Sequence, residues 1–391
     1  MGNVIALVVF WAGLALVAYS YAGYPLLLWL WARRAARPLP PPLEPAALPQ
    51  LSLLIAAHDE EGVIVNKLAN CAALDYPADR LEVLVGSDGS RDATNELVRK
   101  HGGPNVRLLD FEAWRGKAAV LNDLMAAAQG EVLVFSDANT QLEPPALKRL
   151  AAHFADPRVG AVGGHLVLHR AATAAGGADE SLYWRFETAL KAWEGQLGLL
   201  AAAPGALHAQ RRALARPVPV QRMISDDLFL AGSVLLQGYA VTYAPTAVGH
   251  ETAAAETRGE LRRKIRVAET AYNTLPYLWP LLLPGRGQVS ARVAWMFWSH
   301  KLLRWLVPFL MLGIFGANLF LLDQPLYQLA FVGQAGFYAA AALGYVVEHY
   351  RPPPKWLSFP YYFTGANLAL LVGCLRSLTR PATPTWSRAA R

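Results

Sequence analysis

The stretch Leu51-Ser52-Leu53-Leu54-Ile55-Ala56-Ala57-His58-Asp59-Glu60-Glu61 is an apolar run that leads into a polar turn. It predicts a buried strand over 51–57, followed by the start of a helix. Beyond it, short β-rich runs alternate with amphipathic segments. The expected strands are 81–86, 106–109 and 131–135, and the expected helices are 63–73, 93–101 and 117–128. This alternation predicts an α/β fold with a mostly parallel sheet that is covered on both faces.

The chain continues with a further expected strand over 159–167 and an aromatic helix over 179–199. The helix carries large apolar side chains among charged ones, namely Tyr183, Trp184, Phe186, Leu190 and Trp193. Such a stripe suits a helix that lies along a bilayer surface, and it suits a core helix that packs on the sheet equally well. The sequence leaves both alternatives open.

The composition predicts that part of the chain lies in lipid, because 54% of the 391 residues are hydrophobic and only 17% are charged. No charged side chain occurs from residue 4 to residue 32, a run that is long enough to cross a hydrocarbon core of ~30 Å. Arg33, Arg34 and Arg37 follow it, and such cations mark the cytoplasmic side of a membrane helix. We expect residues 1–37 to be a retained anchor with the N-terminus outside, because the run is too long for a typical cleaved signal peptide.

Apolar segments return in the last third of the chain, at 302–322, 326–347 and 359–375. Together with the N-terminal anchor they predict four crossings, one N-terminal and three within 301–378, with an interfacial segment at 276–300. Four crossings from an outside N-terminus would leave the basic tail, 379–391, outside the cell, whereas positive charge favours the cytoplasmic side. The side of the tail therefore stays open.

Between the anchors, residues 38–49 form a proline-rich spacer, and residues 50–275 form the expected catalytic domain on the cytoplasmic side of the cell's inner (plasma) membrane. Cys71 and Cys374 lie in different regions without metal-ligand spacing, so no disulfide framework is implied. The net charge of +7 is not taken as a sign of nucleic-acid binding, because the basic residues gather beside membrane segments and no recognition motif accompanies them. Anionic lipid head groups are the expected partner for this charge.

Three acidic clusters divide the first two-thirds of the chain. The segments Ser87-Asp88-Gly89-Ser90 and Ser136-Asp137-Ala138-Asn139 each close an apolar run, and Ser225-Asp226-Asp227-Leu228 enters a helical stretch. A carboxylate just past a buried strand lies at the edge of the sheet, where it can meet a phosphate-bound cation or a reacting hydroxyl. Each cluster alone is also compatible with a turn or a helix cap. All three in this order favour an enzyme that acts on an activated sugar.

With these motifs, the chain resembles the family 2 glycosyltransferases, in particular the membrane-integrated branch of chitin, hyaluronan, cellulose and poly-N-acetylglucosamine synthases. The resemblance covers roughly residues 49–271 and rests on several motifs in the family's order and approximate spacing. It implies a GT-A-type domain that binds a nucleotide sugar, with a UDP sugar as the expected donor. It further implies a glycan or lipid acceptor at the membrane and an inverting transfer, with polysaccharide synthesis as one outcome.

The resemblance implies two nucleotide contacts in the first half of this domain. Asp88 matches the aspartate that contacts the nucleoside, although Ser87 stands where many members carry another aspartate. Lys117 matches the Gly-Lys segment, which places a cation and a helix N-terminus near the diphosphate. A solvated helix start is the structural alternative for Lys117.

The resemblance places a metal site at Asp137 and Asn139, where the family carries its Asp-x-Asp motif. Two hard oxygen ligands there would hold Mg²⁺ or Mn²⁺ against the diphosphate. The amide of Asn139 can ligate but carries no charge. Metal binding is therefore expected to be weaker than in the family pattern, or to depend on substrate phosphates and water.

Asp227 matches the last aspartate of the family's Thr-Glu-Asp segment, which implies that it is the general base. A direct displacement at the anomeric carbon needs a carboxylate that takes the proton of the acceptor hydroxyl. Asp226 is a neighbour that can tune Asp227.

Arg266 matches the arginine of the Gln-x-x-Arg-Trp motif, which implies a guanidinium contact to the diphosphate. A juxtamembrane patch that binds lipid head groups is the structural alternative. Val267 replaces the tryptophan that stacks on the acceptor sugar, so repeated addition is in doubt. Trp184 and Trp193 are other candidates for sugar stacking.

A rival hypothesis is a catalytically impaired, membrane-tethered protein that binds a nucleotide sugar without turning it over. This hypothesis rests on three positions at which the chain differs from the family pattern, namely Ser87, Asn139 and Val267. A transporter is disfavoured because the expected spans hold few charges. A dinucleotide oxidoreductase is disfavoured because the first strand turn lacks Gly-x-Gly-x-x-Gly. The enzyme hypothesis requires residues 88, 137 and 227 to converge on one pocket.

Overall fold

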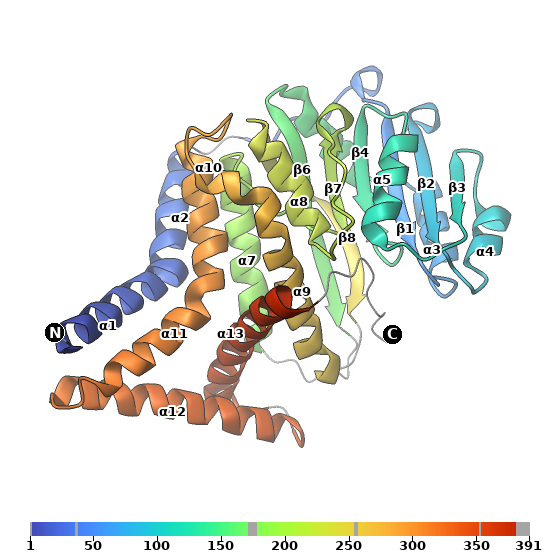
Figure 1. Ribbon diagram of the computed structural model, residues 1–391. Coiled ribbons are helices and arrows are strands. Elements are labelled where there is room, and N and C mark those ends of the chain that lie inside the picture. Colours follow the sequence, from blue (N-terminus) through green and yellow to red (C-terminus); the bar gives the residue numbers. More distant parts are fainter. Residues whose placement is uncertain (1, 36–37, 171–177, 254–256, 352, 381–391) are drawn as a thin grey trace.

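The computed structural model describes residues 2–35, 38–170, 178–253, 257–351 and 353–380. A layered domain built on one sheet occupies one side of the molecule, and long apolar helices extend from its other side (Figure 1). Helices α7 and α9 lie between these two parts in the same view. The structure thus has the GT-A-like α/β fold with additional apolar helices that the sequence predicts.

The sheet has the strand order β3-β2-β1-β4-β7-β6-β8-β5. The strands are β1 (Leu51–Ala57), β2 (Leu81–Asp88), β3 (Val106–Phe111), β4 (Val132–Ser136), β5 (Gln141–Leu142), β6 (Val159–Arg170), β7 (Leu207–Arg211) and β8 (Ala240–Ala253). Strand β1 pairs in parallel with β2 and β4, and β2 pairs in parallel with β3. Strand β7 runs antiparallel to both of its neighbours, β4 and β6. The sheet is therefore mixed and mostly parallel.

Helices cover both faces of the sheet. They are α3 (Ile64–Ala72), α4 (Thr94–His101), α5 (Lys117–Ala127), α6 (Ala146–Ala152), α7 (Ala178–Gln196) and α8 (Asp226–Leu236), and α9 (Thr257–Leu278) packs on α8. Leu54 of β1 belongs to the core beneath α5, whereas its neighbours Leu53 and Ile55 belong to the core beneath α3. A strand with two buried faces needs apolar residues at consecutive positions, which explains the apolar run over residues 53–57 of β1. Helix α5 lies so close to β2 that a Cβ on Gly86 would come within 2.4 Å of Val120.

Strand β7 was not predicted from the sequence. Its residues Leu207–Arg211 alternate buried apolar side chains with His208 and Gln210, both of which are also buried. Polar residues at these positions imitate the pattern of a half-exposed strand or a loop, so the periodicity does not reveal a central strand. Strand β6 is also longer than the expected strand over 159–167, with 12 residues, and it pairs in parallel with the 14-residue β8.

Helix α7 packs within the protein, in agreement with the core-helix alternative. Its Leu190 is buried against Tyr24 and Leu28 of helix α2 (Tyr24–Arg34). The hydroxyl of Tyr24 donates to the carboxylate of Glu194 at 2.7 Å, and His300 also contacts that carboxylate. Helix α7 therefore connects the sheet domain to the apolar helices.

Three of the helices in the described part of the chain are long and apolar enough to cross a membrane: Asn3–Arg34, Ala291–Leu319 and Pro325–Glu348. The first is α1 (Gly2–Ala18) continued through a π-helical turn into α2. The second joins α10 (Ala291–Met296), a further π-helical turn and α11 (Leu303–Leu319), so it begins about three turns before the position expected from the sequence. The third is α12 (Pro325–Glu348).

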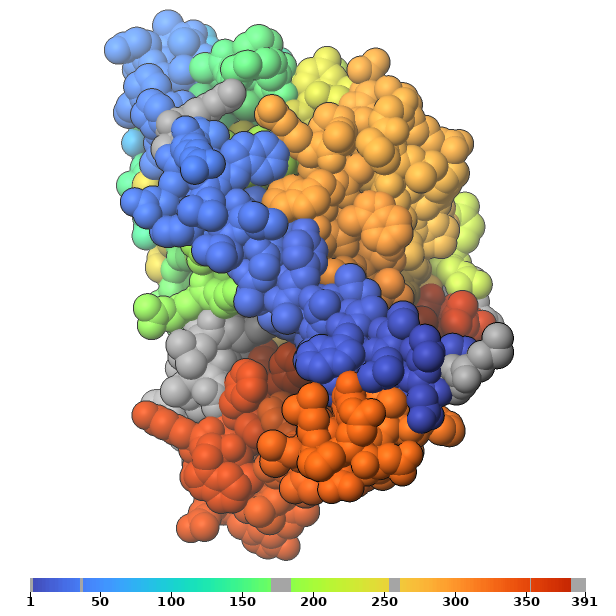
Figure 2. Space-filling model, turned by 90° about the vertical axis from the view of Figure 1, so that its left-hand side faces the viewer, coloured from blue at the N-terminus to red at the C-terminus, as the bar shows by residue number. Residues whose placement is uncertain are grey.

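The N-terminal helix packs along the second apolar helix, and Figure 2 shows these blue and orange segments side by side. Phe10 lies edge-on to Tyr327, with ring centroids 5.2 Å apart, and Phe10 and Ile314 share one buried cluster. The two ends of the sequence thus build one helical body.

The fourth crossing expected at 359–375 is not among these three helices and stays a prediction. Helix α13 (Lys355–Thr379) covers this segment, but it is not among the helices that qualify by length and apolar character. It packs along α9, where a Cβ on Gly373 would lie 2.6 Å from that of Ala268. The ammonium of Lys264 lies 4.0 Å from the ring centroid of Tyr362. Polar and charged residues in a helix of intermediate hydropathy suit packing against the protein better than full exposure to lipid.

Candidate functional site

The carboxyl ends of the parallel strands bring the acidic clusters together. Asp88 is the last residue of β2, Asp137 directly follows β4, and Asp226 is the first residue of α8. Lys117, the first residue of α5, donates from Nζ to Oδ1 of Asp137 at 3.0 Å and forms an ion pair with Oδ2 of Asp226 at 3.1 Å. One lysine thereby links two of the three sequence clusters directly, and Asp227 follows Asp226 in the chain.

Asp88 holds the loop in front of α5. Its Oδ1 accepts from the backbone N–H of Arg115 at 2.8 Å, and its Oδ2 accepts from that of Gly116 at 2.7 Å. Gly116 has φ +93°, a conformation that side chains disfavour. The buried Asp88 carboxylate therefore fixes the segment that positions Lys117. Its contact with the nucleoside stays a prediction.

Lys117 is held as a cation by its two carboxylate partners. Burial alone would lower its pKa, but Asp137 and Asp226 outweigh burial and raise the pKa of Lys117 above its ordinary value. Burial likewise would raise the pKa of Asp226, and Lys117 outweighs it and lowers that pKa. The group is thus one ammonium between two carboxylates, an arrangement that can exchange a carboxylate for a phosphate.

Asp227 has partners different from those of Asp226. Its Oδ1 accepts from the Ser225 hydroxyl and from the backbone N–H of Leu228, the latter at 2.8 Å. On the other side, Lys191 of α7 lies within electrostatic range: burial lowers the pKa of Lys191, and Asp227 is one of the carboxylates that oppose this effect. Asp227 thus lies between the sheet domain and α7.

Asn139 donates from Nδ2 to Oε1 of Glu251, a residue of β8, at 2.8 Å. Asp137 and Asn139 therefore occupy one loop, with the carboxylate of Glu251 beside them. Hard oxygen donors of this kind fit Mg²⁺ or Mn²⁺. Among the described residues, no three His, Cys, Asp or Glu side chains are grouped so as to hold an ion by themselves. Phosphate and water oxygens would have to complete the coordination.

Helix α3 contacts both ends of the loop that carries Asp137 and Asn139, which we call the metal-motif loop (residues 136–140). Lys67 is fully buried and donates from Nζ to Oγ of Ser136 at 2.8 Å and to the backbone oxygen of Thr140 at 2.5 Å. Burial lowers the pKa of Lys67 to about 8, and Cys71 and Asp137 oppose this shift. The sequence analysis did not single out Lys67. Its position on the stripe Ile64, Lys67, Leu68, Cys71 was the available signal, because a lysine on the apolar face of a helix requires a buried acceptor.

His208 is a second residue that the sequence analysis missed. It stacks on Phe135 of β4 with ring centroids 4.5 Å apart, and its Nδ1 lies 3.2 Å from the backbone oxygen of Pro204. Burial lowers its pKa, while the nearby Asp226 and Asp227 raise it in part. His208 therefore forms part of the floor beneath the aspartates. It was missed because β7 was not predicted.

Arg266 lies on α9, and in the contacts between described residues it does not join the aspartate cluster. The same helix reaches the site further along, where the hydroxyl of Thr274 accepts from the backbone N–H of Ser225 at 2.9 Å. Eight residues separate Arg266 from Thr274, which corresponds to ~12 Å along a helix. Burial lowers the pKa of Arg266, and the neighbouring Arg263 lowers it further. Its contact with a diphosphate stays a prediction.

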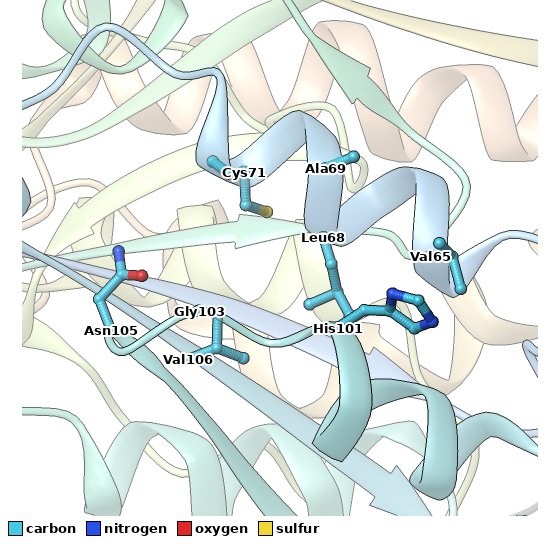
Figure 3. Close-up of a pocket in the computed structure, with 9 residues that line it drawn as sticks. Val65, Leu68, Ala69, Cys71, His101, Gly103, Asn105 and Val106 are labelled. Atoms are coloured by element: carbon cyan, nitrogen blue, oxygen red, sulfur yellow. The ribbon is translucent and has the colours of Figure 1, made fainter.

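A separate hollow lies between α3 and the turn that joins α4 to β3 (Figure 3). Val65, Leu68 and Cys71 line it from α3, opposite His101 and Asn105. The hollow lies near the start of β3, whereas the aspartates lie at the carboxyl ends of the strands. It therefore belongs to neither the metal motif nor the Lys117 cluster.

Two family models match the chain. The model described as glycosyl transferase family 2 matches residues 52–210, and the model described as glycosyl transferase family group 2 matches residues 132–347, more than half of the chain. The chain belongs to glycosyltransferase family 2. The first match contains β1 to β4 and the second contains α8 with Asp226 and Asp227, so together they cover the site.

Curated relatives of this family 2 glycosyltransferase include proteins whose names describe a glycolipid and a polysaccharide as products. A Bacillus subtilis protein named "Probable glycosyltransferase YdaM" is 31% identical over 224 residues, which are 52% of this chain and 51% of the relative. The beta-monoglucosyldiacylglycerol synthase of Synechocystis is 34% identical over 118 residues, 29% of this chain and 25% of the relative. The poly-beta-1,6-N-acetyl-D-glucosamine synthase of Staphylococcus aureus is 25% identical over 58% of this chain and 55% of the relative. The chain spans about half the length of these relatives or less.

Among solved structures, the mannosyltransferase PcManGT from Pyrobaculum calidifontis is similar along the whole chain. The match has a TM-score of 0.71 and covers 97% of this chain and 99% of the mannosyltransferase at 23% identity. That protein was solved in complex with GDP-Man and Mn²⁺. At this identity the likeness concerns the fold, including the helices outside the sheet domain.

Proposed function

We propose that this family 2 glycosyltransferase transfers a sugar, with inversion, from a nucleoside-diphosphate sugar to a glycan or lipid acceptor at the membrane. A UDP sugar is the first candidate for the donor. The observation that carries the proposal is the contact of Lys117 with both Asp137 and Asp226, beside Asp227. It joins a cation, a metal-ligand motif and a candidate base within one site.

In this proposal Asp137 and Asn139 would hold Mg²⁺ or Mn²⁺, and the ion would supply positive charge that stabilises the departing diphosphate. Lys117 has a long side chain, so its ammonium can leave Asp137 for a phosphate oxygen and remain close to Asp226. Asp88 keeps the Lys117 segment in place through the backbone of Arg115 and Gly116. Lys117 therefore supplies positive charge to the diphosphate beside the ion.

Asp227 acts as the base in this proposal. Ser225 and the Leu228 backbone bind Oδ1, which leads us to assign Oδ2 to the acceptor proton. The acceptor oxygen forms the new bond to the anomeric carbon while the bond from that carbon to the diphosphate breaks. The proton goes to Asp227, and the electron pair of the broken bond goes to the diphosphate.

The membrane part of the proposal rests on the three apolar helices, of which the first two contact α7. With the N-terminus outside, three crossings place Arg351, Lys355 and Arg376 on the same side as the sheet domain. Positive charge on that side agrees with a cytoplasmic location. The conflict that arises from four crossings disappears, because the end of α13 then lies in the cytoplasm as well.

The proposal is tested by incubating membranes that contain the full chain with labelled UDP sugars, and with GDP-mannose as a further donor, and then sizing the product. Transfer to lipid or glycan that depends on a divalent metal is expected. Asp227→Asn should abolish transfer and leave donor affinity nearly unchanged, whereas Asp110→Asn, at a surface ion pair on β3, should retain transfer. Donor affinity without any product from the unmodified chain would support the impaired binding protein instead.

A further inference from the structure

The side chain of Asn139 is oriented by a carboxylate. A primary amide has a donor end and an acceptor end, whereas a carboxylate can only accept. The 2.8 Å contact with Glu251 therefore requires the NH₂ group of Asn139 to face Glu251. The amide oxygen then points away from Glu251, and it is the atom that can bind a cation.

The backbone on both sides of this contact is fixed. Glu251 follows His250 in β8, and β8 pairs with β5 through Gln141 and Leu142, directly after the metal-motif loop. On the other side, Asn70 of α3 exchanges two hydrogen bonds of 2.8 Å with the backbone of Leu142. The backbone of the loop is held between α3 and β8. The orientation of the Asn139 side-chain amide is not set by these backbone contacts, and the hydrogen bond to Glu251 sets it.

We propose that Glu251 is a positioning residue that makes the neutral Asn139 an effective metal ligand. This role rests on the metal-dependent transfer proposed above. A hydrogen bond from the amide to a carboxylate also increases the negative charge on the amide oxygen, because the two ends of the amide are conjugated. Glu251 thereby supplies, through its hydrogen bond to Asn139, part of the negative charge that an aspartate at position 139 would bring to the ion directly.

A double-mutant cycle separates this role from a direct effect of the Glu251 charge. Binding of Mn²⁺ in the presence of UDP, or of GDP if only GDP-mannose is a donor, is measured by electron paramagnetic resonance. The samples are the full chain in detergent and the variants Glu251→Gln, Asn139→Ala and their combination. Glu143→Gln is the matched control, because Glu143 lies at the same edge of the sheet and pairs with Arg149 and His250 rather than with Asn139.

Loss of an outer partner of a metal ligand typically lowers metal affinity 10- to 100-fold, and Glu251→Gln belongs at the lower end of this range because glutamine keeps an acceptor oxygen and loses only the charge that polarises the Asn139 amide. Glu251→Gln should weaken Mn²⁺ binding about 10-fold in the otherwise unmodified chain and less than about 3-fold when Asn139 is already alanine. Glu143→Gln should leave it within about 3-fold. An equal loss in both backgrounds, or no loss in either, would overturn the role of Glu251.

The exchanged pair Asn139→Asp with Glu251→Gln gives a second test that does not depend on a loss of function. The glutamine amide can donate to one oxygen of the carboxylate introduced at position 139, and the other oxygen then faces the ion. Mn²⁺ affinity should therefore return to at least that of the unmodified chain. Affinity as weak as that of Glu251→Gln alone would contradict the proposal.

Donor turnover distinguishes this inference from the proposed function on which it rests. Intact metal-dependent turnover with unchanged Mn²⁺ affinity in Glu251→Gln refutes only the role of Glu251. An unmodified chain that transfers sugar without metal refutes both.

Discussion

Replacing Lys67 with methionine should weaken both the fold and the metal site. The substitution keeps the length and apolar stem of the side chain, but it removes the donor to the Ser136 hydroxyl and to the Thr140 backbone oxygen. An unpaired buried polar group costs about 1–3 kcal/mol, so two cost about 2–6 kcal/mol. Relief from burying an ammonium offsets part of this cost, and we therefore expect a net loss of about 2 kcal/mol in the free energy of unfolding.

The assay is chemical unfolding of the purified chain, with Mn²⁺ binding measured on the same samples. Lys100→Met, at an exposed position on α4, is the matched control and should change neither quantity measurably. Mn²⁺ affinity should fall in Lys67→Met because the backbone at Asp137 is no longer fixed. Unchanged stability together with unchanged Mn²⁺ affinity would refute the argument that α3 positions the metal loop.

The same lysine predicts a pH dependence. The folded chain lowers the pKa of Lys67 to about 8 from 10.5, so between these values the unfolded chain binds the additional proton. Stability therefore rises with pH across this window relative to a chain that lacks the group. The difference in unfolding free energy between the unmodified chain and Lys67→Met should increase as the pH is raised through this window. A difference that decreases over the same range would show that Lys67 is not buried as described.

Three further substitutions test other parts of the account. Lys117→Gln should lower affinity for a nucleoside diphosphate with Mn²⁺ about 10-fold or more, measured by calorimetry, because charge-assisted contacts to phosphate are lost; equal affinity would remove Lys117 from the donor site. Gly116→Ala should cost about 1–3 kcal/mol of unfolding free energy, measured with denaturant, because φ is +93°; no cost would show that this turn relaxes freely. Leu378→Cys in a chain with Cys374→Ser should react with a membrane-impermeant thiol reagent only after cells are opened, and labelling of intact cells would contradict three crossings.

The pattern of the sequence predicts the first half of the sheet well, for a local reason. Strand β1 begins at Leu51 and ends at Ala57 as expected, because its two buried faces favour apolar residues at consecutive positions. Strand β7 escapes prediction because His208 and Gln210 are buried polar residues within a strand whose neighbours come from distant parts of the chain. The apolar character of α13 likewise does not reveal that this helix packs against α9.

In the candidate site, too, the sequence predicts residues that belong to local motifs but not their contacts with residues far away in the chain. Asp88, Asp137 and Asp227 could be named from strand ends and from motif order. The partners that decide their behaviour could not, because Lys117 meets Asp226 across 109 positions of sequence and Asn139 meets Glu251 across 112. Only the Lys67 position carried a local signal, since its helical spacing places a charge on an apolar stripe.

The central claim is that residues 88, 117, 137 and 227 surround one donor molecule. A structure of the full chain with Mn²⁺ and an unreactive analogue of its nucleotide sugar tests this claim most directly. The account predicts the ion on Asp137 and Asn139, the diphosphate within hydrogen-bond distance of Lys117, and the carboxylate of Asp227 on the face of the sugar opposite the diphosphate. A donor bound away from Lys117 and Asp137, or Asp227 on the same face as the diphosphate, would contradict it.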